Sequence, residues 1–130
     1  MSDTNVATVD RMTRAIFDQD HDTLAQIFTD GFVFHFRAPS PEAGDYKGVG
    51  GVLEVLGGLF EATNGDIKLD QMYCASTGDW VSEWEHATFG RNGKTLECDN
   101  GFNYRFENGR IAEMWMYIGA LPAEAEAFFA

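Results

Sequence analysis

Hydrophobic and polar residues follow two different periods along this chain, that of helices first and that of strands later. Apolar residues recur at helical spacing over residues 4–18, 22–28 and 50–63, which predicts three amphipathic helices. Between the second and third of these segments, residues 32–37 alternate in the way typical of a strand. The prolines and glycine of residues 39–44 then predict an irregular loop.

The second half of the chain has the pattern of strands joined by tight turns. Residues 66–76 predict one strand, and residues 80–118 predict three antiparallel strands in series. Asn92-Gly93 and Asn108-Gly109 join these three, and Asn-Gly is typical of two-residue hairpin turns. A short helix with proline in its first turn is predicted for residues 121–129. This order predicts one α+β domain over residues 1–130, a bent antiparallel or mixed sheet covered on one face by helices.

Composition narrows the classes of partner. The chain has 21 acidic and 9 basic residues and a net charge of -12, which repels nucleic acids and anionic lipid surfaces, so neither is expected as a partner. It has no apolar run near the ~20 residues that span a bilayer and no signal-peptide pattern, so we expect a cytoplasmic protein. The spacing of Cys74 and Cys98 matches neither a metal-binding motif nor a redox motif. We therefore expect both to be reduced thiols in the core, and we expect no metal site.

The strand around Trp84 carries a candidate site. Strand alternation places Trp80, Trp84 and His86 on one face, and Glu83 and Glu85 on the other. Two unpaired glutamates are costly to bury, so the face with the tryptophans and the histidine is predicted to be the inner one. An imidazole among aromatic side chains would suit a small-molecule pocket with acid–base chemistry.

Three residues are candidates for proton transfer. His86 is the first, and the alternative is a core histidine bonded to a backbone carbonyl. Alternation leaves His35 on the face opposite to its neighbouring phenylalanines, so it points into the pocket or away from it. Asp99 enters the pocket only if Gly101 marks a bulge that shifts the strand by one residue. The remaining histidine, His21, lies among aspartates at a helix start, where helix capping explains it.

Further side chains are predicted to line the same pocket. Asn100 and Tyr104 share the apolar face of their strand, where each would hydrogen-bond either a ligand carbonyl or another group of the protein. The expected ligand-binding set is Trp80, Trp84, Asn100, Phe102, Tyr104, Met114, Met116 and Phe36.

Two long segments of the chain carry a resemblance to a known family. Phe32-Val-Phe-His-Phe with Gly44-Asp-Tyr-Lys-Gly48, and the later run Tyr104–Tyr117, resemble the SnoaL-like branch of the nuclear transport factor 2-like superfamily. The resemblance covers nearly the whole chain. It implies a cone-shaped curved sheet wrapped around helices, with a pocket at the open end, and it implies a histidine commonly at position 35 that faces this pocket. The superfamily includes ketosteroid isomerases, polyketide cyclases, epoxide hydrolases and non-catalytic members, so function must come from the site.

Transfer of the superfamily's known catalytic residues leaves one activity supported. The two carboxyl positions of ketosteroid isomerases fall near Phe36 and Phe102, which do not ionise. The epoxide hydrolase positions fall on Trp84, His86 and Gly119, which do not support that mechanism. Polyketide cyclases of the family use a single acid–base group, a role that His86 could fill.

We therefore expect a pocket protein that performs cofactor-free acid–base chemistry on a lipophilic carbonyl compound, such as isomerisation, cyclisation or dehydration. The alternative is a non-catalytic module that binds an apolar ligand.

A homodimer is also expected. The last strand is largely apolar on both faces, with Met114 and Met116 on the inner one and Trp115 and Tyr117 on the outer one. Together with Val81 and Phe89 of a neighbouring strand, Trp115 and Tyr117 would form an apolar patch that a monomer rarely exposes. The resemblance implies dimers through this face of the sheet.

Overall fold

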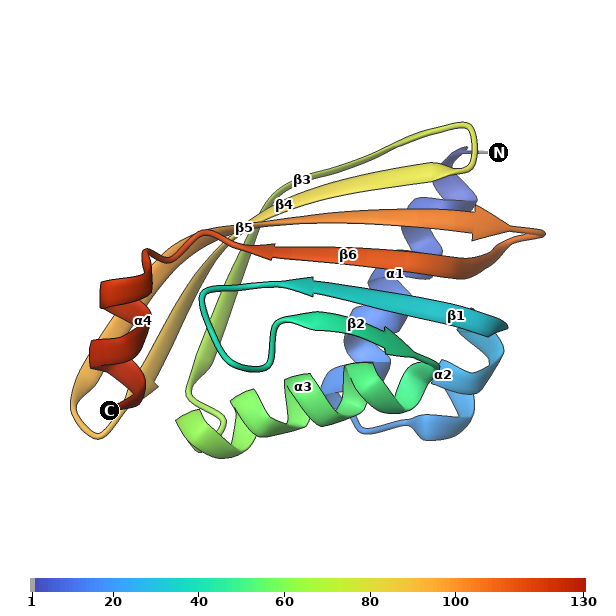
Figure 1. Cartoon of the computed structure of the whole chain (residues 1–130). Helices are drawn as coiled ribbons and strands as arrows, with labels where there is room; N and C mark the ends of the chain where they lie inside the picture. Colours follow the sequence, from blue (N-terminus) through green and yellow to red (C-terminus); the bar gives the residue numbers. More distant parts are fainter. Residues whose placement is uncertain (1) are drawn as a thin grey trace.

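Six strands form one curved sheet, and three helices lie in its concavity (Figure 1). The computed structural model describes the backbone of residues 2–130 and the side chains of residues 4–130. In these residues the elements are α1 (Ser2–Phe17), α2 (His21–Ile27), β1 (Phe28–Arg37), β2 (Gly44–Lys47), α3 (Val49–Thr63), β3 (Ile67–Thr77), β4 (Trp80–Arg91), β5 (Lys94–Glu107), β6 (Arg110–Ile118) and α4 (Pro122–Phe129). The predicted α+β class, with helices first and strands after them, is confirmed.

The strands lie in the order β2-β1-β6-β5-β4-β3, so β2 and β3 are the two edge strands of an open sheet. The pairing of β1 with β6 is parallel and every other pairing is antiparallel, which makes the sheet mixed. Register shifts interrupt the pairing of β3 with β4, of β5 with β6 and of β1 with β6. Such bulges increase local twist and help to bend the sheet around the helices.

The two Asn-Gly hairpins form as predicted and fix the register of the long strands. Asn92 and Gly93 have φ values of 52° and 78°, and Asn108 and Gly109 have 51° and 78°. Positive φ at both central residues defines the turn that matches the twist of flanking strands, and Asn and Gly are the residues that adopt it at least cost. The first turn pairs residues 91 and 94, and the pairing then continues without a shift along the whole of β4, as far as Arg105 of β5.

The main core lies between the inner face of the sheet and α1, α2 and α3. Val9, Leu24 and Val52 from the three helices are buried against Phe32 and Phe34 of β1. Asp20 is the N-cap of α2, and its carboxylate accepts a hydrogen bond from the Thr23 backbone N–H. A second apolar cluster lies at the other end of the sheet, where α4 buries Ala125 and Phe128 against β4 and β5. No helix in the described part of the chain is long and apolar enough to cross a bilayer.

One element departs from the sequence prediction. Residues 44–47 form β2, an edge strand paired with β1, where the prolines and glycine predicted only a loop. Tyr46 on this strand lies against Phe34, with ring centroids 6.0 Å apart. Four residues are too few to display a strand period in the sequence, so tertiary pairing decided this segment.

Candidate functional site

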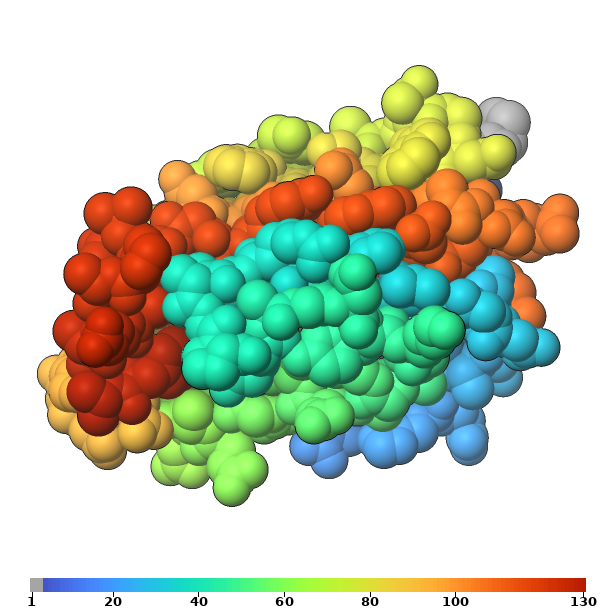
Figure 2. All heavy atoms as spheres, in the orientation of Figure 1, coloured from blue at the N-terminus to red at the C-terminus, as the bar shows by residue number. Residues whose placement is uncertain are grey.

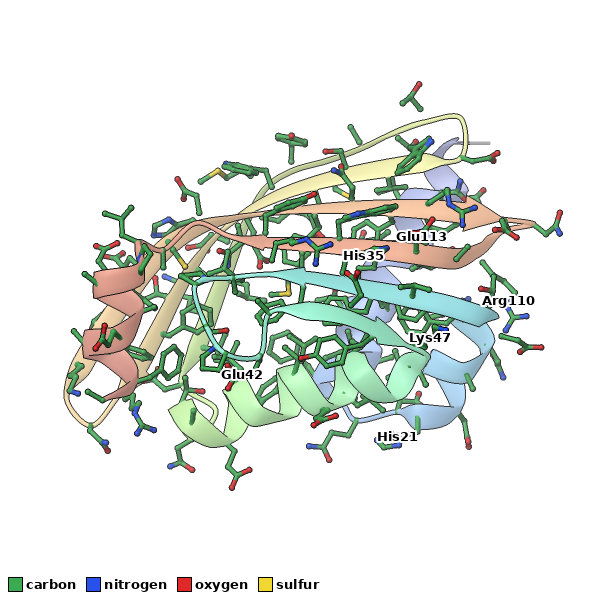
Figure 3. The ribbon with its side chains drawn as sticks, in the orientation of Figure 1. His21, His35, Glu42, Lys47, Arg110 and Glu113 are labelled. Carbon is green, nitrogen blue, oxygen red and sulfur yellow. The ribbon has the colours of Figure 1, made fainter. Side chains whose placement is uncertain are left out.

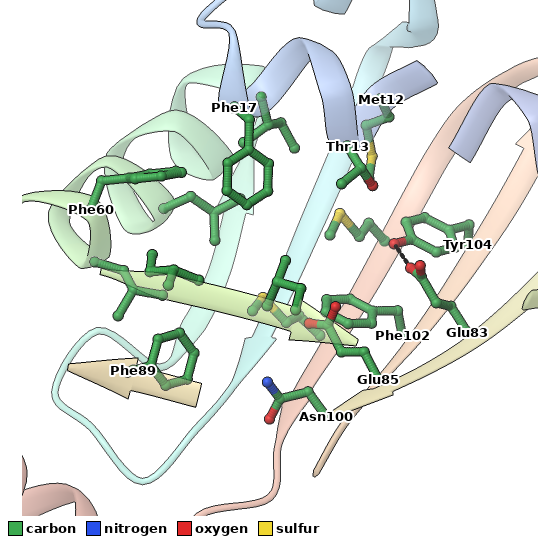
Figure 4. A pocket seen from close by; sticks show the side chains of 17 residues that line it. Met12, Thr13, Phe17, Phe60, Glu83, Glu85, Phe89, Asn100, Phe102 and Tyr104 are labelled. Atoms are coloured by element: carbon green, nitrogen blue, oxygen red, sulfur yellow. Dashed lines mark hydrogen bonds between the residues drawn. The ribbon is translucent and has the colours of Figure 1, made fainter. Parts of the chain in front are cut away.

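A cavity of about 70 Å³ lies between the inner face of the sheet and the helices α1 and α3 (Figure 4). Its walls are mostly apolar. They are formed by Met12, Thr13, Ile16, Phe17, Leu56, Leu59, Phe60, Ile67, Leu69, Glu83, Glu85, Phe89, Asn100, Phe102, Tyr104, Met114 and Met116. A concave, mostly apolar cavity with a few polar groups is typical of a small-molecule site.

A second, more polar cavity of about 240 Å³ adjoins the first. Asp10, Thr13 and Arg14 of α1 line it together with side chains of β3 and β4. Both cavities share Glu83 and Glu85, so these two carboxyl groups can be approached from an apolar and from a polar side.

Three polar side chains are buried in the sheet wall of the apolar cavity. Glu83, Glu85 and Asn100 are only 6%, 7% and 0% exposed. Glu85 and Asn100 are paired across β4 and β5, so their side chains leave the sheet on the same face. Figure 4 shows this pair opposite Phe17 and Phe60 of the helices. Buried polar groups require partners, so the hydrogen bonds of each one decide what it can do.

Glu83 is held by two donors. The Tyr104 hydroxyl donates to Oε1 at 2.8 Å, and the Gln71 amide donates to Oε2 at 2.7 Å. Burial, followed by the charge of Glu83, raises the pKa of Tyr104 well above its ordinary value. The phenol therefore stays protonated and remains a donor, and the two hydrogen bonds fix the carboxyl group of Glu83 beside the cavity.

Glu85 has different surroundings and a shifted pKa. Burial and then the nearby charge of Glu83 raise its pKa to about 7, while the Asn100 amide opposes this shift. A carboxyl group with a pKa near neutrality exists in both forms at physiological pH and can accept or donate a proton. Glu85 is therefore the described residue of the cavity best suited to general acid–base chemistry.

Asn100 directs its amide donor into this region. Its Oδ1 accepts the Gly119 backbone N–H at 3.2 Å and the Cys98 thiol at 3.4 Å. Burial raises the pKa of Cys98 to about 11, so this thiol remains protonated. Both donors to Oδ1 fix the orientation of the amide. Its buried Nδ2 is near enough to Glu85 to oppose the rise of that group's pKa, but it forms no hydrogen bond of normal geometry with the described residues. An unsatisfied buried donor costs about 1–3 kcal/mol, which a ligand oxygen would recover.

Several predicted pocket residues lie where the sequence placed them. The cavity wall contains Asn100, Phe102, Tyr104, Met114 and Met116. Phe36 is buried in the main core but does not line the cavity.

The prediction that Trp80, Trp84 and His86 lie on the inner face of β4 is wrong. Trp80 and Trp84 are 44% and 39% exposed and lie with His86 on the outer face, whereas Glu83 and Glu85 point inward. The premise that the glutamates would be unpaired fails, because Glu83 has two donors and Glu85 is partly protonated near pH 7.

The other proton-transfer candidates also lie outside the cavity. His86 forms hydrogen bonds with Asp99 and Glu97 on the outer face, so the proposed one-residue slip at Asp99 does not occur. His35 lies on the same face, between Asp45 and Glu113. Val81 and Phe89, expected on the outer patch, are buried on the inner face, whereas Tyr117 is exposed there as predicted.

Sequence reasoning missed Glu83 and Glu85, although the chain contains a signal for them. A two-residue turn at Asn92-Gly93 pairs Glu85 with Asn100 and His86 with Asp99. Paired residues of an antiparallel ladder share a face, so an inward Asn100 requires an inward Glu85. As to other site types, no group of three or more metal-ligating side chains forms a metal-binding cluster in the described residues.

The curved sheet around helices, with a cavity in its concavity, is the fold of a nuclear transport factor 2-like protein from Burkholderia xenovorans LB400, with which the chain shares 14% identity at a TM-score of 0.76. The chain belongs to the SnoaL-like domain family, which matches residues 9–114. No curated protein matched the sequence.

Solved structures agree with this assignment. The chain is 25% identical to Bal32a from a soil-derived mobile gene cassette, with a TM-score of 0.84 and coverage of 99% of this chain and 98% of Bal32a. It is also 25% identical to a Xanthomonas campestris protein of unknown function with a cystatin-like fold, with a TM-score of 0.79 and coverage of 100% and 99%. A protein from Jannaschia sp. CCS1, proposed to be a SnoaL-like polyketide cyclase, shares the fold at 19% identity, with a TM-score of 0.82 and coverage of 100% and 94%.

Proposed function

We propose that this protein is a cofactor-independent enzyme that performs acid–base chemistry on a small lipophilic carbonyl compound, either an isomerisation or a cyclisation. One observation carries the proposal: a buried carboxyl group with a pKa of about 7, Glu85, lies beside the unpartnered Nδ2 of Asn100 in an apolar cavity. The polyketide cyclase assignment among the structural relatives fits this class of chemistry.

The two groups have complementary roles. Ionised Glu85 removes a proton from the carbon next to the substrate carbonyl, and the electrons of that C–H bond form the enolate double bond. Nδ2 of Asn100 donates a hydrogen bond to the enolate oxygen, where negative charge develops. In an isomerisation, the proton then passes from Glu85 to a different carbon and the carbonyl forms again. In a cyclisation, the enolate carbon attacks a second carbonyl, whose π electrons move to its oxygen, and Glu85 gives its proton to that alkoxide.

Glu83 and Tyr104 tune this chemistry without touching the substrate's reacting carbon. Burial, followed by the charge of Glu83, raises the pKa of Glu85, which makes Glu85 a stronger base once it is ionised. The hydrogen bond from Tyr104 holds Glu83 in place at 2.8 Å. When two carboxyl groups of one site have different surroundings, their pKa values differ. One group can then stay charged while the other carries the proton.

The mostly apolar wall of the cavity favours a second candidate, a non-catalytic module that binds an apolar ligand. One experiment separates the two. Conversion of the β,γ-unsaturated isomer of cyclohexenone to its conjugated isomer would be followed by ultraviolet absorbance. Exchange of its α-hydrogens with deuterated water would be followed by NMR.

The enzyme proposal expects the wild type to accelerate both processes and Glu85→Gln to reduce the acceleration ~100-fold or more. Ligand affinity of this variant should change little, because Gln keeps the size of the side chain. Glu61→Gln, on the exposed surface of α3, is the matched control and should behave as the wild type. Binding of the ketone without any acceleration by the wild type would favour the binding module and defeat the enzyme proposal.

A further inference from the structure

The apolar cavity is smaller than the substrates proposed for it require. Its volume is about 70 Å³, whereas an engineered apolar cavity that binds benzene, a ring of the size of cyclohexenone, has about 150 Å³. The adjoining polar cavity offers a lipophilic ring no alternative, because the charged residues Asp10 and Arg14 line it. A six-membered ring therefore fits the apolar cavity only when one of its walls moves outward.

The helix side of the cavity is the wall that can move. The residues on its sheet side lie mostly on β4, β5 and β6, which pair with a neighbouring strand on both edges. On the helix side, α3 contributes Leu56, Leu59 and Phe60, and Figure 2 shows part of this helix, in green, at the molecular surface. Phe60 contacts Phe17 of α1 edge to face, with ring centroids 5.1 Å apart. Because Phe17 is 43% exposed, this aromatic pair lies between the cavity and solvent.

Two consecutive glycines weaken the turn of α3 that covers the cavity. Gly57 and Gly58 lie between the cavity residues Leu56 and Leu59, and both glycines are exposed. A Cβ on either one would meet no atom of the described residues within 4 Å, so packing does not require glycine there. Glycine is less favourable than alanine inside a helix and is among the usual sites of helix kinks. This turn therefore bends at a lower cost than the same turn with alanines.

The N-terminal end of α3 is fixed to the sheet. Figure 3 shows Lys47, the last residue of β2, at this end of the helix. The next residue, Gly48, donates its backbone N–H to the carbonyl of Phe32 at 2.7 Å. A Cβ at Gly51 would overlap the side chain of Tyr46, so the first turn of the helix lies directly on β2. The first turn of α3 is therefore held against the sheet.

The C-terminal end of α3 is fixed as well. Arg91 of β4 donates a hydrogen bond from Nη1 to the carbonyl of Ala62 at 3.1 Å. Thr63 is buried, and its hydroxyl donates to the carbonyl of Leu59 at 2.8 Å, a bond that often accompanies helix bending. A helix that is fixed at both ends and weak in the middle bends in the middle.

We propose that α3 is a lid on the apolar cavity: it bends outward at Gly57-Gly58, parts Phe60 from Phe17 and thereby admits a neutral carbonyl compound with a six-membered ring. This inference rests on the proposed function only in taking the cavity as the ligand site, and it does not depend on catalysis by Glu85. The bend breaks the helical hydrogen bonds that the N–H groups of residues 58–61 form across the hinge. A bound ring keeps the lid bent, because the closed cavity cannot contain it.

A double variant, Gly57→Ala with Gly58→Ala, strengthens the hinge without adding bulk to the cavity. It should lower the population of the bent helix about tenfold or more. Only the bent state accepts the ring, so the apparent affinity should fall by the same factor. The variant would therefore be more stable than the wild type and yet bind more weakly. A purely structural role of the two glycines would leave the affinity unchanged.

Two measurements on the full chain test the lid. Native-state hydrogen exchange of the ligand-free protein should give residues 58–61 lower protection factors than the central strand β5, and the double variant should raise them about tenfold or more. Cyclohexanone, a neutral ring ketone that cannot isomerise, would then be titrated while NMR follows the methionine methyl groups. Met12, Met114 and Met116 line the cavity, whereas Met72 is exposed on β3 and is the internal reference. The dissociation constant should rise about tenfold or more in the double variant.

Gly50→Ala is the matched control. Gly50 is exposed in the first turn of α3, and a Cβ there would also meet no described atom within 4 Å, so this variant should match the wild type in both measurements. Protection of residues 58–61 equal to that of β5 would overturn the hinge. A double variant that raises this protection without weakening cyclohexanone binding would overturn the lid alone. If the ketone shifts none of the three cavity methyl groups, the ligand site of the proposed function fails, and the lid as its entrance fails with it.

Discussion

Replacement of Glu85 by Gln should change how the stability of the protein depends on pH. Burial and the charge of Glu83 raise the pKa of Glu85 from 4.5 to about 7 in the folded state. The folded state therefore binds this proton more tightly than the unfolded state does. The stabilisation is fully present below pH 4.5 and is lost as pH rises through 7.

The size of the effect follows from the shift. Each pKa unit corresponds to about 1.4 kcal/mol, so the complete loss is about 3 kcal/mol. Most of this loss, about 2 kcal/mol, falls between about pH 5 and about pH 8. Gln does not titrate, so Glu85→Gln should lose about 2 kcal/mol less stability than the wild type over this interval.

Urea unfolding monitored by tryptophan fluorescence at both pH values measures the difference. Glu61→Gln, which removes an exposed glutamate, should follow the pH dependence of the wild type. The reasoning is refuted if wild type and Glu85→Gln lose the same free energy of unfolding between the two pH values. That result would mean that Glu85 titrates in the folded protein as it does in water.

Two further substitutions test how the polar groups of the cavity are held. Tyr104→Phe removes a donor to Glu83 and should lower the free energy of unfolding by about 1–3 kcal/mol, measured in urea; an unchanged value would show that this hydrogen bond does not hold the carboxylate. Gly119→Ala would bring a Cβ onto the carbonyl oxygen of Asp99 and should destabilise the fold by about 1–3 kcal/mol, measured by thermal unfolding, whereas a wild-type melting temperature would contradict the close approach.

The fold could be predicted from the sequence because its signals agree at several levels. Three helical periods, the two Asn-Gly turns and the proline of α4 all indicate the elements that the structure contains. The inward positions of Asn100 and Tyr104 were also predictable, because the other residues of that strand face are apolar. β2 was not, because its pairing with β1 is a tertiary contact.

The site was harder to predict because hydrophobicity alone indicates that the wrong face of β4 is buried. Two tryptophans favour burial of one face and two glutamates oppose burial of the other, yet the structure exposes Trp80 and Trp84. The face with the glutamates can be buried because Glu83 accepts hydrogen bonds from two donors and Glu85 has a pKa near 7. The register set by the hairpin turn was the stronger signal, because it ties the face of β4 to that of β5.

The pH dependence of the isomerisation of the β,γ-unsaturated cyclohexenone tests the central claim most directly. If Glu85 is the base, the rate constant should rise with pH and level off above an apparent pKa of about 7, since the ionised form removes the proton. In Glu85→Gln this rise should disappear together with ~100-fold or more of the rate. A wild-type rate with no transition near pH 7, or a Glu85→Gln variant with the same rise, would contradict the assignment of Glu85 as the proton carrier.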